Sequence, residues 1–184
     1  MPTRGRRDTG LMRVVAGTAG GRRLSAPSSG AMRPTSDLMR EAVFNALHSR
    51  SAVADAVVLD LFAGTGALGI EALSRGAAWA TFVDCSTEWA RLVEANLLAC
   101  GFTDRAEVVV ADGPNWLVAN RGPWDLVLLD PPYSFDGWPA LLGGPLVGSV
   151  TGMVVVESDR EVDPGPLWNV GSTRRHGSTV VTLL

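Results

Sequence analysis

Four consecutive residues, Asp130, Pro131, Pro132 and Tyr133, are the part of the sequence best suited to chemistry. They end an almost continuously apolar run that starts at Trp124, which predicts a strand buried on both faces. Because the two prolines exclude a helix and have no N–H donor, the chain must leave this strand as a stiff arch. A carboxylate, bare carbonyl oxygens and an aromatic ring are therefore expected at the strand's carboxyl end, the edge where open α/β sheets bind ligands.

Such a cluster suits a planar amine, for example the exocyclic NH2 of a nucleobase. The lone pair of that nitrogen is delocalised into its ring, so the amine is a poor nucleophile. If the Asp130 carboxylate and the Pro131 carbonyl accept its N–H bonds, the nitrogen moves toward tetrahedral geometry and its lone pair points at an electrophile, while Tyr133 stacks on the base. A structural Pro-Pro turn after a capping aspartate would have the same sequence, and the tetrapeptide alone leaves both interpretations open.

A second motif lies between a predicted strand and a predicted helix. The segment from Gly64 to Gly69 reads G-T-G-A-L-G and matches the pattern G-x-G-x-x-G, which brings the backbone close to a ligand at a helix N-terminus. Asp84 ends the next predicted strand, eighteen residues after Gly66, where it could accept both hydroxyls of a ribose. These features serve NAD and S-adenosylmethionine equally well.

Carboxylates end four successive predicted strands, and their charge favours one of the two candidate cofactors over the other. These residues are Asp60, Asp84, Asp112 and Asp130. Together they would repel a diphosphate, whereas a sulfonium cofactor carries no phosphate. Asp60 could bind the ammonium of a methionine moiety and Asp112 the N6 amine of adenine, although either, Asp112 above all, could instead only cap the following helix. The predicted cofactor-binding set is Asp60, Ala63, Gly64, Thr65, Gly66, Asp84, Asp112 and Gly113.

The elements that position these residues alternate between strand and helix, which predicts a mostly parallel sheet with helices on both faces. The expected strands are Val57–Leu61, Ala80–Asp84, Glu107–Asp112, Trp124–Asp130, Met153–Glu157, Leu167–Arg174 and Ser178–Leu184. The last two form a closing hairpin, and residues 13–26 form another around a glycine-rich turn. A helix over Leu38–Leu47 is expected to bury Leu38 and to leave Arg40 outside its apolar stripe.

Length and charge limit the class of protein. The 184 residues suggest one domain, in which 1–35 form a basic arm and hairpin and 36–184 the catalytic domain. Residues 1–50 hold nine arginines and three acids (+6), and residues 51–184 hold seven arginines and sixteen acids (−9). A basic front on an acidic body predicts a bound polyanion, with a solvated basic tail as the alternative. The expected RNA contacts are Arg13, Arg22, Arg23, Arg33, Arg174 and Arg175, with His176 beside them at the hairpin tip.

The segment VLDLFAGTGALGIEALSRGA, the strand ending in Asp84 and the segment LLDPPY resemble class I S-adenosylmethionine-dependent methyltransferases that act on exocyclic amines. The N-terminal segments MRVVAGTAGGRRL and MRPTSDLMREAVFNAL are similar to the front of the RsmD family, the 16S rRNA guanine-N2 methyltransferases. The resemblance runs from about Met12 to the C-terminus. It carries the family's glycine-loop, acidic and DPPY positions over to Gly64, Gly66, Asp84, Asp112 and 130–133. The arginine-rich extension before Met12 and the absence of lysine depart from it.

The resemblance implies S-adenosylmethionine as cofactor and 16S rRNA as substrate, either free or within an assembled small ribosomal subunit. Because DPPY is shared with adenine and cytosine amino-methyltransferases, a DNA or other RNA amino-methyltransferase is the nearest rival. A nicotinamide-dependent reductase explains only the glycine loop and Asp84. The sequence also predicts a cytoplasmic monomer without metal, secretory signal or membrane span, in which Cys85 and Cys100 are reduced.

Overall fold

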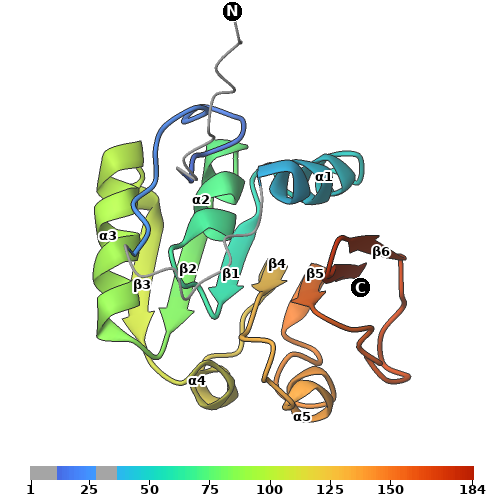
Figure 1. The fold of residues 1–184 in the computed structure, drawn as a ribbon. Helices are drawn as coiled ribbons and strands as arrows, with labels where there is room; N and C mark the ends of the chain where they lie inside the picture. Colours follow the sequence, from blue (N-terminus) through green and yellow to red (C-terminus); the bar gives the residue numbers. More distant parts are fainter. Residues whose placement is uncertain (1–11, 28–36) are drawn as a thin grey trace, which may run out of the picture.

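The computed structural model describes residues 12–27 and 37–184, which form one seven-stranded sheet with helices on both faces (Figure 1). The strands are β1 Val57–Leu61, β2 Trp79–Asp84, β3 Ala106–Val110, β4 Trp124–Leu129, β5 Val150–Ser158, β6 Ser172–His176 and β7 Thr179–Leu183. Their order across the sheet is β3-β2-β1-β4-β5-β7-β6. Strands β1 to β5 are parallel, and β7 is antiparallel to both of its neighbours. The predicted fold class is confirmed.

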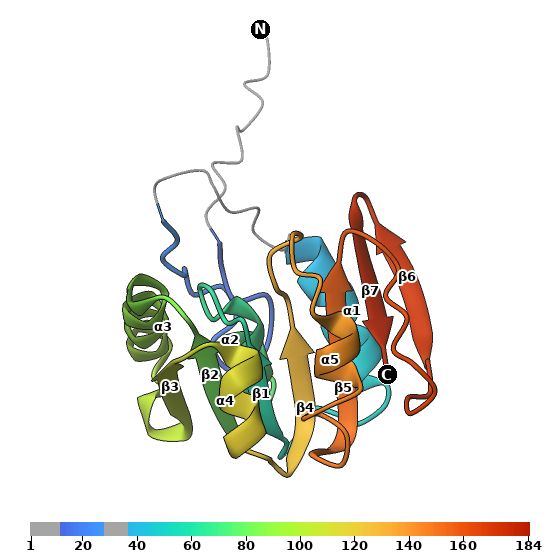
Figure 2. The same cartoon turned by 90° about the horizontal axis from the view of Figure 1, so that it is seen from below.

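The helices cover the sheet in two layers, each with its own core. They are α1 Asp37–His48, α2 Ala67–Ser74, α3 Thr87–Cys100, α4 Gly113–Ala119 and α5 Trp138–Leu142, with a short 3-10 turn, η1, at Thr103–Arg105. Helices α1, α2 and α3 lie on one face, and α4 and α5 lie in front of the other in Figure 2. Along β4, Leu126 and Leu128 join the first core while Val127 and Leu129 join the second. This alternation explains why the central strands are apolar throughout.

Most predicted element ends agree with the structure within two residues. The Ser86 hydroxyl accepts a hydrogen bond from Trp89 N and begins α3, and Gly101, with φ 76°, ends it. The largest difference is the strand expected from Leu167, which begins only at Ser172. Trp168 packs toward the second core instead, and its indole N–H donates to the Leu142 carbonyl at 2.7 Å.

Helix α1 contradicts two predictions about burial. Leu38 is 78% exposed, whereas Arg40 is fully buried. The buried face contains Val43, Phe44 and Leu47, which follow Arg40 by three, four and seven residues, the spacing of one helical face. Leu38 lies on the opposite face of the helix. Residue type misled the prediction here, because the spacing itself places Arg40 inward.

The N-terminal hairpin packs on α2. Its two arms pair through Val14 N to Arg22 O and Leu24 N to Met12 O, both 2.9 Å, and this confirms the expected hairpin. Its apolar side chains, Met12, Val14, Ala19 and Leu24, belong to the first core. The proposed boundary between residues 35 and 36 falls outside the described residues. Over 12–27, however, the hairpin shares its core with the sheet.

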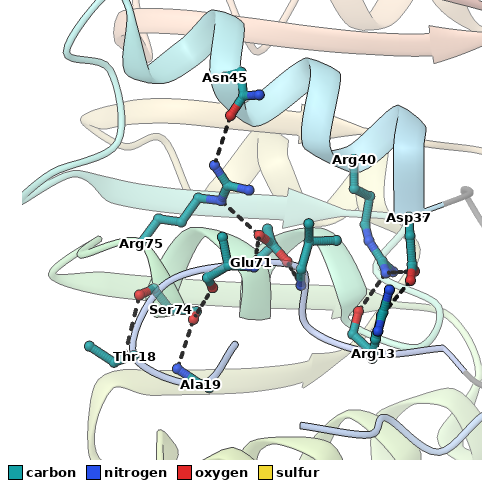
Figure 3. Close-up of polar contacts among 11 residues, drawn as sticks. Arg13, Thr18, Ala19, Asp37, Arg40, Asn45, Glu71, Ser74 and Arg75 are labelled. Atoms are coloured by element: carbon teal, nitrogen blue, oxygen red, sulfur yellow. Dashed lines mark hydrogen bonds and ion pairs between the residues drawn. The ribbon is translucent and has the colours of Figure 1, made fainter. Parts of the chain in front are cut away.

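Buried polar groups on α2 fix the hairpin in place (Figure 3). The fully buried Glu71 carboxylate accepts the N–H groups of Val15 and Ala16 at 2.7 and 3.0 Å, and the Arg75 Nε at 2.7 Å. The Ser74 hydroxyl accepts from Ala19 N at 3.0 Å. Because α2 follows the glycine loop directly, the hairpin is attached to the element that carries the predicted cofactor site.

Candidate active site

The predicted carboxylates converge at the carboxyl edge of the central strands. Across that edge Leu61 of β1 pairs with Val83 of β2 and with Leu129 of β4. Asp84 and Asp130 each come one residue later, so they flank the start of the glycine loop on its two sides. Asp60 lies one residue earlier, within β1. The geometry therefore brings these three predicted side chains together.

The glycine loop turns sharply at the end of β1. Phe62, Gly64 and Gly66 have positive φ values of 72°, 53° and 77°. For Phe62 this left-handed conformation is strained, as is common at functional sites. A Cβ on Gly69 would lie 2.3 Å from the Phe82 ring and 3.0 Å from an Asp60 oxygen, so the third glycine of the motif is needed for close packing of α2 on the sheet.

Asp84 supports the loop through its two oxygens. Oδ2 accepts from Gly64 N and Oδ1 from Ser86 N, both at 2.9 Å. The side chain is partly exposed, and each carboxylate oxygen can accept a further hydrogen bond. An acceptor pair fixed beside a glycine turn fits the two hydroxyls of a ribose. Ala63 and Thr65 lie in the same loop, and the Thr65 hydroxyl contacts Met12 Sδ of the hairpin at 3.3 Å.

Asp60 is buried at its predicted strand end. Its Oδ2 accepts from Gly69 N at 2.9 Å. Burial is the main cause that raises the pKa of Asp60 to about 8, and the nearby charges of Asp130 and Asp84 add to it. At neutral pH this carboxyl is therefore mostly protonated. The expected ion pair with a methionine ammonium would require it to ionise, and that role stays a prediction.

Asp112 caps α4. Its Oδ1 accepts from Asn115 N at 3.1 Å, which is the capping role that the sequence offered as an alternative. The side chain remains exposed, so its predicted bond to an adenine amine stays a prediction. Gly113 is buried, and a Cβ there would lie 3.0 Å from Leu61 Cγ. It therefore packs α4 against β1 at the same edge.

The arch after β4 presents the predicted catalytic residues. Asp130 is partly exposed, Pro131 is buried and Pro132 is exposed. Tyr133 is 37% exposed, and its hydroxyl lies 2.9 Å from the Thr179 hydroxyl at the start of β7. Phe135 N donates to Pro132 O at 2.8 Å and closes the turn. The tyrosine ring is thus partly open to solvent and held at its far end.

Aromatic packing joins this arch to the glycine loop. The Phe135 ring lies 5.2 Å from Phe62 and 5.1 Å, edge-on, from Trp138. Phe62 begins the cofactor loop and Phe135 follows the arch, so the two halves of the candidate site are in direct contact. Pairs of this kind add roughly 0.5–1.5 kcal/mol beyond area burial.

The predicted RNA-binding arginines divide into two groups. Arg13 and Arg23 lie opposite each other on the hairpin, and Arg13 Nε is 2.9 Å from Asp37 of α1. Arg22 donates to the Ala99 carbonyl at 2.7 Å, so it binds the last turn of α3, a role that the sequence did not indicate. Arg33 lies outside the described residues.

The second group lies on the closing hairpin. Two antiparallel pairings in succession make β6 run in the same direction as β5, so the β6–β7 turn lies at the carboxyl edge (Figure 2). Arg174 pairs with Val181 and Arg175 with Val180, so the two arginines point to opposite faces. Arg174 shares its face with Thr179 and Val181, on the side of α1 and the N-terminal hairpin.

Sequence reasoning missed several residues that shape the site. They are Phe62, Asn96, Phe135, Arg160 and Thr179. The two phenylalanines adjoin the glycine loop and the DPPY motif, and this proximity in the sequence could have indicated them. Arg160 and Thr179 reach the arch from the ends of β5 and β7, contacts that depend on strand order and have no local signal.

Three comparisons place the chain among known proteins. A family model described as conserved hypothetical protein 95 matches residues 12–184. Ribosomal RNA small subunit methyltransferase D of Escherichia coli K12 is 38% identical over 125 residues, which cover 68% of this chain and 62% of that protein. The match thus spans less than two thirds of that relative's length. YlbH of Bacillus subtilis 168, provisionally named an rRNA methyltransferase, is 36% identical over 94% of this chain and 97% of its own.

A solved structure agrees over nearly the whole chain. The E. coli protein yhhF, provisionally named a methyltransferase, superposes with a TM-score of 0.81 at 32% identity and covers 95% of this chain and 97% of its own. Its name and those of the sequence relatives agree with the class I methyltransferase fold observed here. The family model, the full-length relative and the fold all lead to one assignment: the chain belongs to the RsmD family.

Proposed function

We propose that this protein transfers a methyl group from S-adenosylmethionine to the N2 amine of a guanine in 16S rRNA. The observation that carries the proposal is the contact between the glycine loop and the Asp130–Tyr133 arch through Phe62 and Phe135. A cofactor site and an amine-binding site are then neighbours at one edge of the sheet. A cytoplasmic, monomeric enzyme is part of the same proposal.

The chain's residues fit the cofactor in outline. Asp84 would hold the ribose hydroxyls, and Gly64 and Gly66 would let the backbone approach the ligand, with Ala63 and Thr65 beside them. Asp112 and Gly113 would border the adenine. When bound, S-adenosylmethionine supplies an electrophilic methyl on a positive sulfur. No phosphate has to be accommodated beside Asp60, Asp84 and Asp130.

The arch would activate the acceptor. Asp130 and the Pro131 carbonyl would accept the N–H bonds of a guanine that has left its helix, because N2 cannot be reached in line within a duplex. Tyr133 would stack on the ring. The new N–C bond forms as the S–C bond breaks, and the amine then loses a proton to solvent. Orientation of this kind contributes up to ~7–11 kcal/mol in well-placed cases.

The direct test maps methylated 16S rRNA by mass spectrometry from cells with and without this gene. The expected result is one guanine that is 14 mass units lighter in cells without the gene. Its mass should be restored when the gene is put back. Asp130→Ala should lower kcat roughly 100-fold or more while S-adenosylhomocysteine still binds. Near-normal turnover of that variant would contradict the role of Asp130. Methylation of bare duplex DNA would favour the rival amino-methyltransferase, and binding of NADH in place of S-adenosylhomocysteine would favour the reductase.

The closing hairpin offers a matched test of the RNA surface. Arg174 lies on the face of Thr179, which contacts Tyr133, whereas its neighbour Arg175 points to the opposite face. We expect Arg174→Ala to weaken binding of a 16S rRNA transcript about 3–10-fold and to reduce its salt slope by roughly 1, with Arg175→Ala near wild type. If ~4–6 phosphates are bound, the wild-type slope of log affinity against log salt lies near −3 to −5. Equal effects of the two variants would contradict this surface.

A further inference from the structure

The segment after Pro132 has to be held in place if Tyr133 is to orient a base. It leaves the sheet after two prolines, and residues 130–137 belong to no helix or strand. Its carbonyl groups cannot enter a sheet ladder. Side-chain donors from outside the arch can therefore hold the segment in one conformation.

Arg160, two residues after β5, supplies these donors. Its Nη1 donates to the Tyr133 carbonyl at 3.2 Å and its Nη2 to the Phe135 carbonyl at 3.1 Å. The same two nitrogens contact Asp159 at 2.9 Å and Asp136 at 2.7 Å. One planar guanidinium therefore spans two carbonyls of the segment, a geometry that the point charge of lysine does not reproduce.

Arg160 is itself fixed to the sheet. The buried Ser158 side chain, at the last position of β5, donates its hydroxyl to the Arg160 carbonyl. Strand β5 pairs with β4, which ends at Leu129, one residue before Asp130. The guanidinium thus links the segment back to the strand next to the one it leaves, so a rigid element sets its position.

Tyr133 is consequently held at both ends. Arg160 binds its carbonyl, and the buried Thr179 contacts its hydroxyl at 2.9 Å. The first contact fixes the backbone at Tyr133 and the second fixes the far end of its side chain, so the long axis of the ring has one direction. The ring placed in this way is the surface on which a base would stack.

We propose that Arg160 is a positioning residue that, together with Thr179, sets the position and the long axis of the Tyr133 ring for the incoming base. This role rests on the proposed function. The two ion pairs with Asp136 and Asp159 are solvent-exposed and contribute little. The positioning of Tyr133 therefore depends on the hydrogen bonds from Arg160 to the Tyr133 and Phe135 carbonyls.

Tyr133 is the single tyrosine of the chain, which makes a direct test available. Protein labelled with 3-fluorotyrosine reports this ring alone by ¹⁹F NMR, without substrate. The wild-type resonance should differ from that in urea. Arg160→Ala should move the resonance toward the urea position and narrow it, and Arg160→Lys should do the same. Asp136→Asn, which removes an ion pair but keeps both carbonyl bonds, should leave it unchanged.

Kinetics supply the second readout. Arg160→Ala should lower kcat about 10-fold, with the Kd for S-adenosylhomocysteine within 2-fold, and Arg91→Ala on the exposed side of α3 serves as surface control. Because the Arg160 side chain is 44% exposed, Arg160→Ala and Arg160→Lys are both expected to fold. Circular dichroism checks this. Resonances of both Arg160 variants at the wild-type position would overturn the proposal. A wild-type protein with an ordered Tyr133 but no methyl transfer would contradict the proposed function alone.

Discussion

The carboxyl of Asp60 responds to pH in the opposite sense from a salt-bridged carboxylate. Its pKa is raised from 3.8 to about 8, mainly because it is buried. The folded state therefore binds the proton more tightly than the unfolded state does. Its contribution to stability is complete below the unfolded pKa and is lost as pH rises toward 8, at about 1.4 kcal/mol per pH unit within that window.

Asp60→Asn should remove this dependence, because an amide keeps the acceptor for Gly69 N and carries no proton to lose. The difference in free energy of unfolding between variant and wild type should increase in favour of the variant from pH 5 to pH 8 and then level off. Urea denaturation at each pH measures it. Parallel curves for the two proteins would mean that the burial of Asp60 does not control its ionisation.

For single residues, the sequence predicted where side chains lie along the sheet better than it predicted their protonation and burial. The four strand-end aspartates were identified, and three of them converge as expected. The protonation of Asp60 could not be predicted, since it depends on burial and on two carboxylates from other strands. The burial of Arg40 could have been predicted from spacing to Val43, Phe44 and Leu47, had residue type been given less weight.

Among the elements, the link between hairpin and glycine loop has the clearest consequence. The buried Asn96 of α3 accepts from Ser25 N at 2.7 Å and donates to Ser25 O at 3.1 Å and Thr65 O at 2.9 Å. One amide thus binds the hairpin and the cofactor loop together. This link could not be predicted from the sequence, because an asparagine within an amphipathic helix has many structural uses.

Asn96→Asp should weaken both attachments, since a carboxylate cannot donate to the two carbonyls. We expect a loss of roughly 2–3 kcal/mol in stability, a Tm lower by about 5–10 °C, and weaker binding of S-adenosylhomocysteine. Differential scanning fluorimetry and calorimetry measure the two quantities. Asn169→Asp, at an exposed position, is the control, and equal behaviour of the two variants would exclude the proposed link.

For the whole molecule, one question is whether the N-terminal hairpin unfolds with the sheet or separately. Its apolar side chains lie in the first core and Glu71 binds its backbone. Both features favour a single cooperative unit over residues 12–27 and 37–184.

None of the helices that the structure describes in those ranges is long and apolar enough to cross a membrane.

Native-state hydrogen exchange tests this unit. The amides of Val15 and Ala16 should exchange with a free energy within about 1 kcal/mol of that for the β4 amides, whereas the turn at Gly177 should exchange by local opening. Much faster exchange at Val15 and Ala16 would show that the hairpin is an independent arm. Alternation of strands and helices predicted the sheet from sequence, but the docking of the hairpin depends on long-range contacts with no local pattern.

The pair formed by Arg13 and Arg23 has one more consequence. Residues directly opposite on antiparallel arms share a face, so two positive groups repel each other there. Asp37 offsets this only in part, because its other oxygen is bound by Arg40 at 2.6 Å. A phosphate group bound between the two arginines would relieve the repulsion, so the hairpin should become more rigid if the proposed RNA substrate binds there.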